Sequence, residues 1–210
     1  MPFADRNAAG FLLATSLEEY KDKPVVVFAL PRGGVALGKI VAQHLHAPLD
    51  LLIPRKIGHP DNPEYAIASV SEKGKVIKNE LEVSRIDPAW FEAEVERQRG
   101  EAARRRVKYL ADRTPVDVKG KTAIIVDDGI ATGLTMKAAI DEARAKEPSA
   151  VVLAVPVAPR DTIRELEKLV DRLIVLKRPL QFQGSIGFYY KNFSQVSDEE
   201  VIEMMSDLAL

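Results

Sequence analysis

Cysteine is absent from this sequence, and so are long apolar runs. Without cysteine the protein can form no disulfide and no thiolate metal site, and it has no thiol nucleophile. No apolar run approaches the roughly 18 residues of a membrane-spanning helix, so we expect no membrane partner. Residues 1–6 contain neither the basic segment nor the apolar core of a secretory signal, which predicts a cytoplasmic protein.

An excess of charge of either sign is also missing. The 30 lysines and arginines nearly balance the 31 aspartates and glutamates, and the formal net charge is −1. This balance predicts that nucleic acid is not a partner. Histidine is scarce and offers no metal cage: we interpret His44 and His46, at a predicted helix end, as structural, and His59 as exposed.

The most informative stretch of the chain is 122–137. Residues 123–126 form a short, β-branched apolar run that is typical of a buried parallel strand. Asp127 and Asp128 follow at once, where the strand would leave the sheet. Two carboxylates would repel a phosphate, so they suit sugar hydroxyls, a magnesium-bearing group or developing positive charge better.

A glycine-containing loop follows the two acids and leads into a predicted helix. The loop covers 129–133 and the helix runs over about 134–146. Such a loop presents backbone N–H groups, here with the hydroxyls of Thr132 and Thr135, at the positive end of a helix. That arrangement suits a phosphate. The alternative is a strand-end acid pair that only caps the helix.

The run 125–135 closely resembles the binding motif for phosphoribosyl pyrophosphate (PRPP) of the type I phosphoribosyltransferases. The resemblance implies that Asp127 and Asp128 hold the ribose 2′- and 3′-hydroxyls. It also implies that Mg²⁺ is a cofactor carried by PRPP, with these two acids as the protein groups that could touch it. The residues implied to hold the 5′-phosphate are Gly129, Ile130, Ala131, Thr132, Gly133, Leu134 and Thr135.

Two other predicted strands end in basic segments. Residues 25–30 run into a segment similar to the pyrophosphate loop of that family, formed by Pro31, Arg32, Gly33 and Gly34. The strand predicted over 50–53 runs into Arg55 and Lys56. The resemblance implies that these two residues bind pyrophosphate and that, together with Asp127 and Asp128, they are catalytic. We interpret 54–65 as a long irregular loop that corresponds to the family's mobile loop. The alternative for 31–34 is a simple turn between a strand and a helix, and the alternative for Arg55 and Lys56 is a solvated pair of cations.

Strands and helices alternate along most of the chain, which predicts an α/β fold. We expect an open, mainly parallel sheet flanked by helices, as in the type I phosphoribosyltransferases. Ligands of such sheets bind outside the carboxyl ends of the strands, so the three segments should meet there; Arg160 follows another predicted strand. The chain should form a single domain over 1–210, with its core at about 24–178 and a hood at about 179–210 that includes N-terminal residues.

An insertion at about 85–113 interrupts this pattern. A long helix is predicted over 87–111, with Asp87 as its N-cap and an apolar face that includes Phe91 and Val95. We expect this face to contribute to a homodimer. The basic run 104–106 is interspersed with glutamates, which predicts a solvated face.

Aromatic residues gather near the end of the chain, in the predicted hood. By resemblance, an aromatic ring of the hood stacks on the nucleobase, and the candidates are Phe182, Phe188, Tyr189 and Tyr190. The alternative is that these rings only pack the hood against the sheet. Lys191 and Asn192 stand where many purine enzymes of the family carry an acid, so the resemblance does not indicate a purine.

The resemblance implies an enzyme, a pentosyltransferase of nucleotide salvage that moves phosphoribose from PRPP to a nitrogenous, nucleobase-like acceptor and releases pyrophosphate. A PRPP-binding regulatory protein with weak or no catalysis is a second hypothesis. A hydrolase or another phosphate-sugar enzyme on the same cradle is a third. The fold alone does not choose among them.

Overall fold

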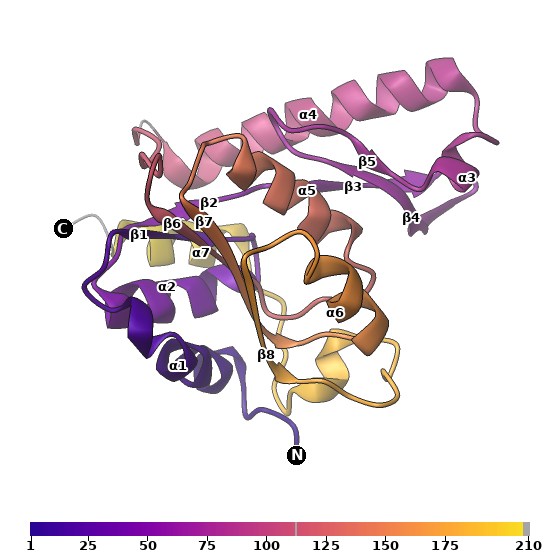
Figure 1. Cartoon of the computed structure of the whole chain (residues 1–210). Coiled ribbons are helices and arrows are strands. Elements are labelled where there is room, and N and C mark those ends of the chain that lie inside the picture. The colour runs from indigo at the N-terminus through magenta and orange to yellow at the C-terminus, as the bar shows by residue number, and fades with distance from the viewer. Residues whose placement is uncertain (112, 208–210) are drawn as a thin grey trace.

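The core of the protein is a five-stranded parallel sheet with helices on both faces (Figure 1). The structure is a computed structural model that describes residues 1–111 and 113–207. The strands lie in the order β2-β1-β6-β7-β8, and every neighbouring pair is parallel. Their bounds are β1 Val25–Ala29, β2 Leu49–Leu51, β6 Thr122–Val126, β7 Ala150–Val157 and β8 Arg172–Lys177. The predicted α/β fold is confirmed.

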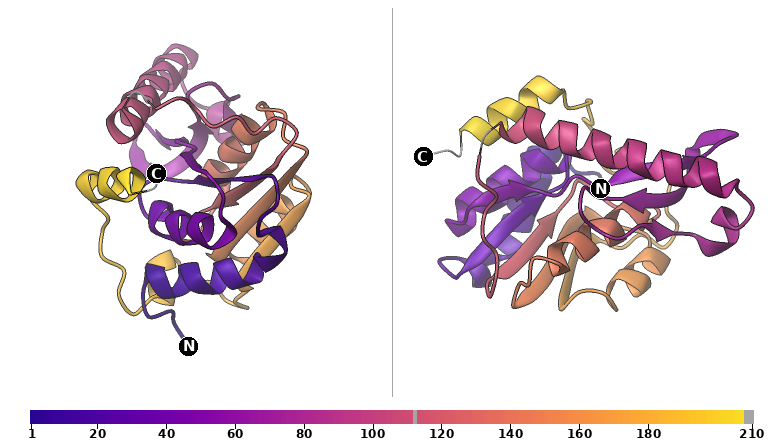
Figure 2. Two further views of the ribbon diagram at one scale, coloured as in Figure 1. Left: turned by 90° about the vertical axis from the view of Figure 1, so that its left-hand side faces the viewer. Right: turned by 90° about the horizontal axis from the view of Figure 1, so that it is seen from above.

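Two sets of helices cover the two faces of this sheet (Figures 1 and 2). One face packs against α1 Arg6–Ser16, α2 Gly34–Leu45 and α7 Asp198–Ser206, and the other against α5 Leu134–Arg144 and α6 Arg160–Leu166. Two short 3₁₀ helices, η1 Glu18–Tyr20 and η2 Ile186–Tyr189, complete this part of the chain. None of the helices in the described parts of the chain is long and apolar enough to cross a bilayer.

Strand β1 shows why its sequence is apolar throughout. Val25, Val27 and Ala29 belong to the core under α1 and α2, whereas Val26 and Phe28 belong to the core under α5 and α6. Successive side chains of a strand point to opposite faces, so a strand covered on both sides needs no polar position. Complete burial of a side chain such as Phe28 stabilises the fold by about 1.5–3 kcal/mol.

The insertion is larger than expected and is a small unit of its own. It holds an antiparallel sheet in the order β3-β4-β5, together with one short and one long helix. The bounds are β3 Arg55–His59, β4 Asn62–Val70, β5 Ile77–Lys78, α3 Glu80–Val83 and α4 Pro88–Leu110. The long helix α4 lies along the top of the molecule, over these strands (Figures 1 and 2).

The interpretation of 54–65 as an irregular loop is wrong, because β3 and the start of β4 form a hairpin there. Its prolines lie where they interrupt no hydrogen bonds between the two strands. Pro54 precedes β3, Pro60 is in the turn, and Pro63 lies at a register shift. Pro63 packs closely on Gly58, since a β-carbon on Gly58 would lie 2.2 Å from the Pro63 carbonyl oxygen. Proline is tolerated at strand starts and bulges.

Helix α4 begins as predicted but uses its apolar face within the chain. Asp87 Oδ1 accepts a hydrogen bond of 2.9 Å from the Trp90 amide, as an N-cap does. Val95 is buried in the core of the insertion, and Phe91 packs against that core. Val95 is therefore not available for the dimer contact expected of this face, whereas Phe91 is only partly buried and a dimer through it stays a prediction.

Arg106 of α4 ties the insertion to the core sheet, although the sequence predicted a solvated face for it. Its Nη2 donates to the Leu51 carbonyl oxygen at 2.7 Å, and its Nη1 lies 3.5 Å from Asp50 Oδ1. Its Nε is 3.1 Å from Glu72 Oε2. Only 17% of the Arg106 side chain and 4% of the Asp50 side chain are exposed, so this is a largely buried ion pair.

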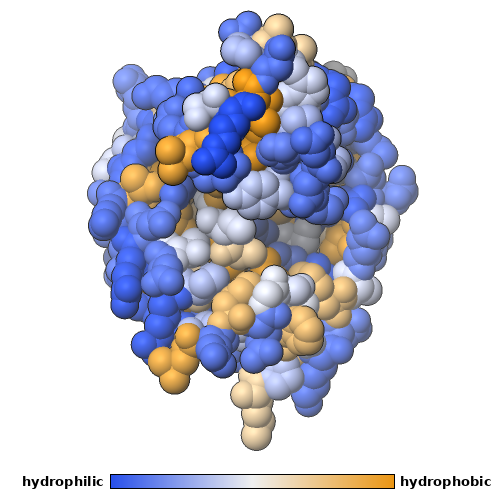
Figure 3. Space-filling view, turned by 90° about the vertical axis from the view of Figure 1, so that its right-hand side faces the viewer, coloured by the Kyte–Doolittle hydropathy of each residue, from blue (hydrophilic) through white to orange (hydrophobic). Residues whose placement is uncertain are grey.

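The insertion also leaves apolar surface uncovered. Leu81 of α3 is 74% exposed. Figure 3 shows hydrophobic residues gathered at the top of the face, where the insertion lies, above a hollowed region.

Candidate active site at the carboxyl ends of the strands

A cavity of about 320 Å³ lies at the carboxyl ends of β1 and β6. The wall consists of the loop after β1, the loop after β6, the start of α5 and one residue of η2. The lining residues are Pro31, Arg32, Gly33, Asp127, Asp128, Gly129, Ile130, Ala131, Thr132, Gly133, Thr135, Met136 and Ile186. Two segments expected to form one site are thus brought together.

The glycines after β1 allow the two loops to touch. A β-carbon on Gly33 would lie 1.9 Å from Asp128 Oδ2, and one on Gly34 would lie 2.8 Å from Asp127 Oδ1. The Gly34 position is closed by backbone as well, because the Val126 carbonyl oxygen is 3.0 Å away. No side chain fits at these positions without displacing the acid pair. This steric limit explains why both positions are glycine.

The loop after β6 is fixed from β7 and α6. The Ile130 amide donates to the Val157 carbonyl at 2.9 Å, and Thr162 Oγ1 donates to the Ala131 carbonyl at 3.1 Å. Gly133, with φ of 82°, stands in the left-handed region at the N-cap of α5 and provides no side-chain cap. The first amides of α5 therefore face the cavity without a capping side chain, which suits an anion.

The two acids lie side by side in a poorly solvated position. Asp127 Oδ1 accepts a hydrogen bond of 2.8 Å from the Asp128 amide. Burial raises the pKa of Asp127 well above its ordinary value, and the neighbouring Asp128 carboxyl raises it further. Burial also raises the pKa of Asp128, and the Arg6 guanidinium opposes this rise.

Arg6 is a residue of this site that the sequence did not reveal, and so are Met136 and Ile186 of the cavity wall. Arg6 Nε and Nη2 each lie 2.9 Å from Asp128 Oδ2. Arg6 stands at the start of α1, 122 positions before Asp128. No periodicity or motif links two residues so far apart; only the fold does.

A family comparison agrees with this geometry. A family model described as a phosphoribosyl transferase domain matches residues 5–191. The chain belongs to this family. Its fold, a parallel sheet flanked by helices, is that of the family, as the sequence predicted.

Two solved structures are similar to this chain. A crystal structure of TT1426 from Thermus thermophilus is 36% identical, covers all of both chains and has a TM-score of 0.83. The structure of AQ2163 protein from Aquifex aeolicus shares the fold, with 16% identity and a TM-score of 0.52 over 85% of this chain and 78% of that one.

A curated relative from Mycobacterium tuberculosis (strain ATCC 25618 / H37Rv), named "Putative phosphoribosyl transferase Rv0571c", is 41% identical over 205 residues. The match covers 97% of this chain and 46% of the relative. The chain therefore spans about half the length of the curated relatives it matches.

Arg32 is the basic side chain that this phosphoribosyl transferase domain brings to the cavity wall. Its Nη1 lies 3.6 Å from Asp198 Oδ1, at the start of α7. Asp198 also accepts hydrogen bonds from Tyr109 Oη at 2.6 Å and Lys108 Nζ at 2.7 Å. Asp198, which the end of α4 holds in place, thus links Arg32 to the start of α7.

Arg55, Lys56 and Arg160 do not line the cavity. Arg55 Nε donates to Gln98 Oε1 at 3.1 Å inside the insertion, where burial lowers its pKa. Lys56 Nζ donates to Glu64 across the hairpin at 3.1 Å. Arg160 lines a separate surface depression. The expected cations of the mobile loop thus lie on the insertion, paired with other groups.

The hood aromatics pack mainly on one another. Tyr190, buried, donates from Oη to the Asp128 carbonyl at 2.6 Å, and burial raises its pKa. Phe182 stacks on Tyr189 with ring centroids 5.4 Å apart, and Phe188 is 69% exposed. None of these rings lines the cavity; Ile186 is the hood residue that does.

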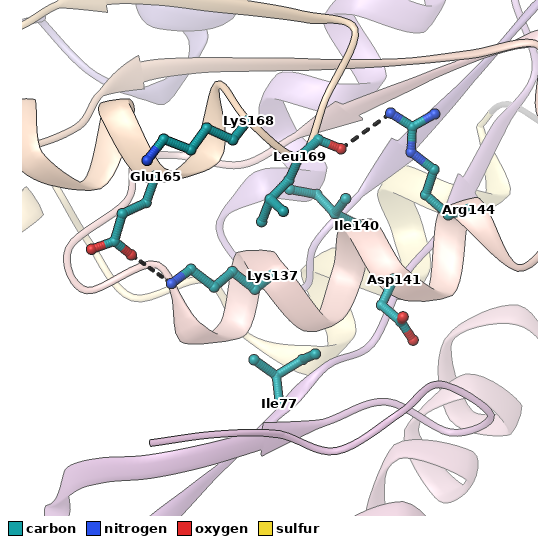
Figure 4. Close-up of a pocket in the computed structure, with 8 residues that line it drawn as sticks. All are labelled: Ile77, Lys137, Ile140, Asp141, Arg144, Glu165, Lys168 and Leu169. Atoms are coloured by element: carbon teal, nitrogen blue, oxygen red, sulfur yellow. Dashed lines mark hydrogen bonds and ion pairs between the residues drawn. The ribbon is translucent and has the colours of Figure 1, made fainter. Parts of the chain in front are cut away.

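A second cavity, of about 520 Å³, lies between β5, α5 and α6 (Figure 4). Several of its charged groups have partners: Lys137 Nζ lies 2.5 Å from Glu165 Oε2, and Arg144 Nη2 donates to the Leu169 carbonyl at 3.1 Å. Apolar side chains such as Ile77 and Ile140 form the rest of the wall. It is larger than the cavity at the acid pair, but it has neither the paired acids nor the glycine loop.

Proposed function

We propose that this chain is a phosphoribosyltransferase that binds PRPP in the cavity at Asp127 and Asp128. The observation that supports this best is the contact between Gly33 and Asp128, because it puts a pyrophosphate-type loop directly beside the acid pair. The loop over 129–133, with Thr135, would receive the 5′-phosphate at the amino end of α5. The sugar would then lie between the two phosphate sites, over the carboxylates.

In the proposed reaction the bond between ribose C1 and the pyrophosphate oxygen breaks. A nitrogen of the acceptor forms the new bond at C1 and loses its proton, and pyrophosphate leaves. The chain offers no cysteine nucleophile, so catalysis would come from positioning and from charge. Asp127 and Asp128 would hold the ribose and stabilise positive charge at C1, and Arg32 would attract the departing pyrophosphate.

Mg²⁺ would fit this site as a companion of the substrate. The described residues include no group of three or more histidine, cysteine or acidic side chains that could hold a metal. Two neighbouring carboxylates, Asp127 and Asp128, are nevertheless a donor set that Mg²⁺ uses together with substrate phosphates and water. When bound, Mg²⁺ would neutralise charge on the pyrophosphate.

A PRPP-binding regulatory role is the second candidate, and one feature favours it. Arg55 and Lys56, the cations expected to follow the pyrophosphate, are paired on the insertion with Gln98 and Glu64. A protein with this arrangement could hold PRPP through the acid pair and its loops without transferring phosphoribose. In the transferase, by contrast, the hairpin β3–β4 could bring a second cation to the cavity beside Arg32.

A pyrophosphate-release assay separates these functions. The protein is incubated with PRPP and Mg²⁺, alone and with a panel of nucleobases and other small nitrogen heterocycles. Release that depends on one acceptor supports the transferase, and release with no acceptor supports a hydrolase. PRPP binding without any release supports the regulatory role. Lys56→Met should abolish release if the hairpin closes on the site. Lys119→Met should not, because Lys119 is exposed and pairs with Glu147 on the surface.

A further inference from the structure

The carboxylate of Asp128 already has a charged partner in this structure. Arg6 contacts it through Nε and Nη2, each 2.9 Å from Oδ2. Both side chains are 13% exposed, so the pair is largely removed from water. Hydrogen bonds between ionised groups are shorter and stronger than neutral ones, and two donors on one oxygen also fix its direction.

Arg6 is itself held by the hood. Its Nη1 donates to the Ser194 carbonyl at 2.6 Å, and its guanidinium lies 3.8 Å from the centre of the Phe193 ring. Phe193 stacks on Tyr190 at 4.9 Å, and Tyr190 Oη donates to the Asp128 carbonyl. The hood thus contacts Asp128 at two points: Arg6 contacts its side chain, and Tyr190 donates a hydrogen bond to its backbone carbonyl.

The contacts also determine which oxygen is left for a ligand. Both contacts of Arg6 with Asp128 are made to Oδ2. Gly33 closes the same side, since a β-carbon there would meet both Asp128 Oδ2 and, at 2.9 Å, Arg6 Nε. Oδ1 is the oxygen that neither group occupies.

We propose that Arg6 is a positioning residue for the sugar. It holds Asp128 by Oδ2 so that Oδ1 accepts a hydrogen bond from a ribose hydroxyl, and it transmits the position of the hood to the acid pair. This inference rests on the proposed PRPP-binding function. It differs from a purely structural role, in which Arg6 would only attach α1 to the hood through Ser194 and Phe193.

The test is a double-mutant cycle on PRPP affinity, measured by calorimetry in the presence of Mg²⁺. The proteins are the wild type, Arg6→Met, Asp128→Asn and the double variant. We expect Arg6→Met to weaken binding about tenfold or more in the wild-type background and less than about twofold in the Asp128→Asn background. If Arg6 acted independently of Asp128, Arg6→Met would lower the PRPP affinity by the same factor in both backgrounds.

Two further variants keep the result interpretable. Arg6→Lys preserves the charge but not the fork of donors, and should bind PRPP within about threefold to tenfold of the wild type. Arg97→Met is the matched control, because Arg97 is 70% exposed and pairs with Glu94 on the outside of α4; its affinity should be unchanged. If Arg6→Met does not fold, Arg6→Lys alone and with Asp128→Asn provides the same cycle.

A ligand without the sugar completes the test. Arg6→Met should bind magnesium pyrophosphate as the wild type does, because that ligand has no hydroxyl for Asp128. Unchanged PRPP affinity in Arg6→Met, equal losses in both backgrounds or an equal loss for pyrophosphate would overturn the inference and leave the proposed function standing. A folded wild type that does not bind PRPP would overturn both.

Discussion

Gly33 and Asp128 are in direct contact, so that a β-carbon on Gly33 would lie only 1.9 Å from Oδ2 of the carboxylate. Arg6 lies 2.9 Å from the same oxygen, so Asp128 cannot move away from Gly33 without disturbing its contact with Arg6. The loop after β1 and the acid pair after β6 are therefore one steric unit. A change in either segment must move the other.

The first prediction follows from this contact. Gly33→Ala should displace the Asp128 carboxylate, weaken PRPP binding by about tenfold or more, and lower the free energy of unfolding by about 1–3 kcal/mol. The matched control is Gly100→Ala on α4, where a β-carbon meets nothing within 4 Å. That change should leave binding intact and stabilise the helix by about 0.5–1 kcal/mol. Calorimetry and urea unfolding measure the two effects, and equal PRPP affinities for the two variants would contradict the steric argument.

The second prediction concerns the link between the insertion and the sheet. Arg106→Met removes the partner of the buried Asp50 carboxylate and should lower the free energy of unfolding by about 2–4 kcal/mol. Arg104→Met is the control on the same helix, because Arg104 is 60% exposed and pairs with Glu101 on the surface. Its effect should be below about 1 kcal/mol. Urea unfolding that gave similar losses for both would show that the link contributes no more than a surface pair.

The third prediction is a pH dependence at Asp198. Hydrogen bonds from Lys108 and Tyr109 lower the pKa of Asp198 to about 2. Because a lowered carboxyl pKa stabilises the fold only while the group is ionised, this contribution is complete above about pH 4 and is lost as the pH falls through about 2. Asp198→Asn should therefore be less stable than the wild type by about 1–2 kcal/mol at pH 7, and the difference should shrink below pH 4.

Unfolding curves of both proteins between pH 2 and pH 7 check this difference. Asp161→Asn is a suitable control, since the Asp161 side chain is 92% exposed. Its difference from the wild type should be small at every pH. A difference for Asp198→Asn that persisted unchanged at pH 2 would show that ionisation of Asp198 is not its source.

The fourth prediction has the opposite sign and concerns Glu142 of α5. Burial raises the pKa of Glu142, and its Oε2 has no hydrogen-bond partner among the described residues. Ionisation of this carboxyl therefore costs stability above its unfolded pKa of about 4.3, and protonation returns that stability as the pH falls. Glu142→Gln should stabilise the protein by about 1 kcal/mol at pH 7 and by less at pH 4.5.

Glu165 provides the contrast for this measurement. Its hydrogen bond with Lys137 lowers its pKa, so Glu165→Gln should be neutral or slightly destabilising at pH 7. Thermal unfolding of the three proteins at both pH values is sufficient. A stabilising effect of Glu142→Gln that is equal at pH 7 and pH 4.5 would exclude the ionisation argument.

Much of the fold could be predicted from the sequence, because the patterns that indicate its strands, loops and helix starts lie within short, continuous segments. The apolar run before Asp127, the loop after it and the helix start are consecutive residues, and each has a recognised physical preference. The same holds for the predicted N-cap: Asp87 begins α4. The geometry brings the acid pair and the loop after β1 to one cavity, while the ligand they hold remains a prediction.

The remaining features depend on contacts between distant segments. The prolines of 54–65 suggested an irregular loop, and only the pairing of β3 with β4 shows that they lie at a strand start, a turn and a bulge. Arg106 looked like one member of a solvated basic run until the fold placed it over Asp50. No sequence pattern marked Arg6 as a site residue, because only the folded chain brings it next to its partner Asp128.

The measurement that tests the proposed function most directly is a calorimetric titration of PRPP with Mg²⁺. It compares the wild type with an Asp127→Asn, Asp128→Asn double variant whose folding is checked by circular dichroism. The proposed site predicts saturable binding to the wild type and affinity at least about a hundredfold weaker in the variant. Absence of binding to the folded wild type, or equal binding to both proteins, would contradict it.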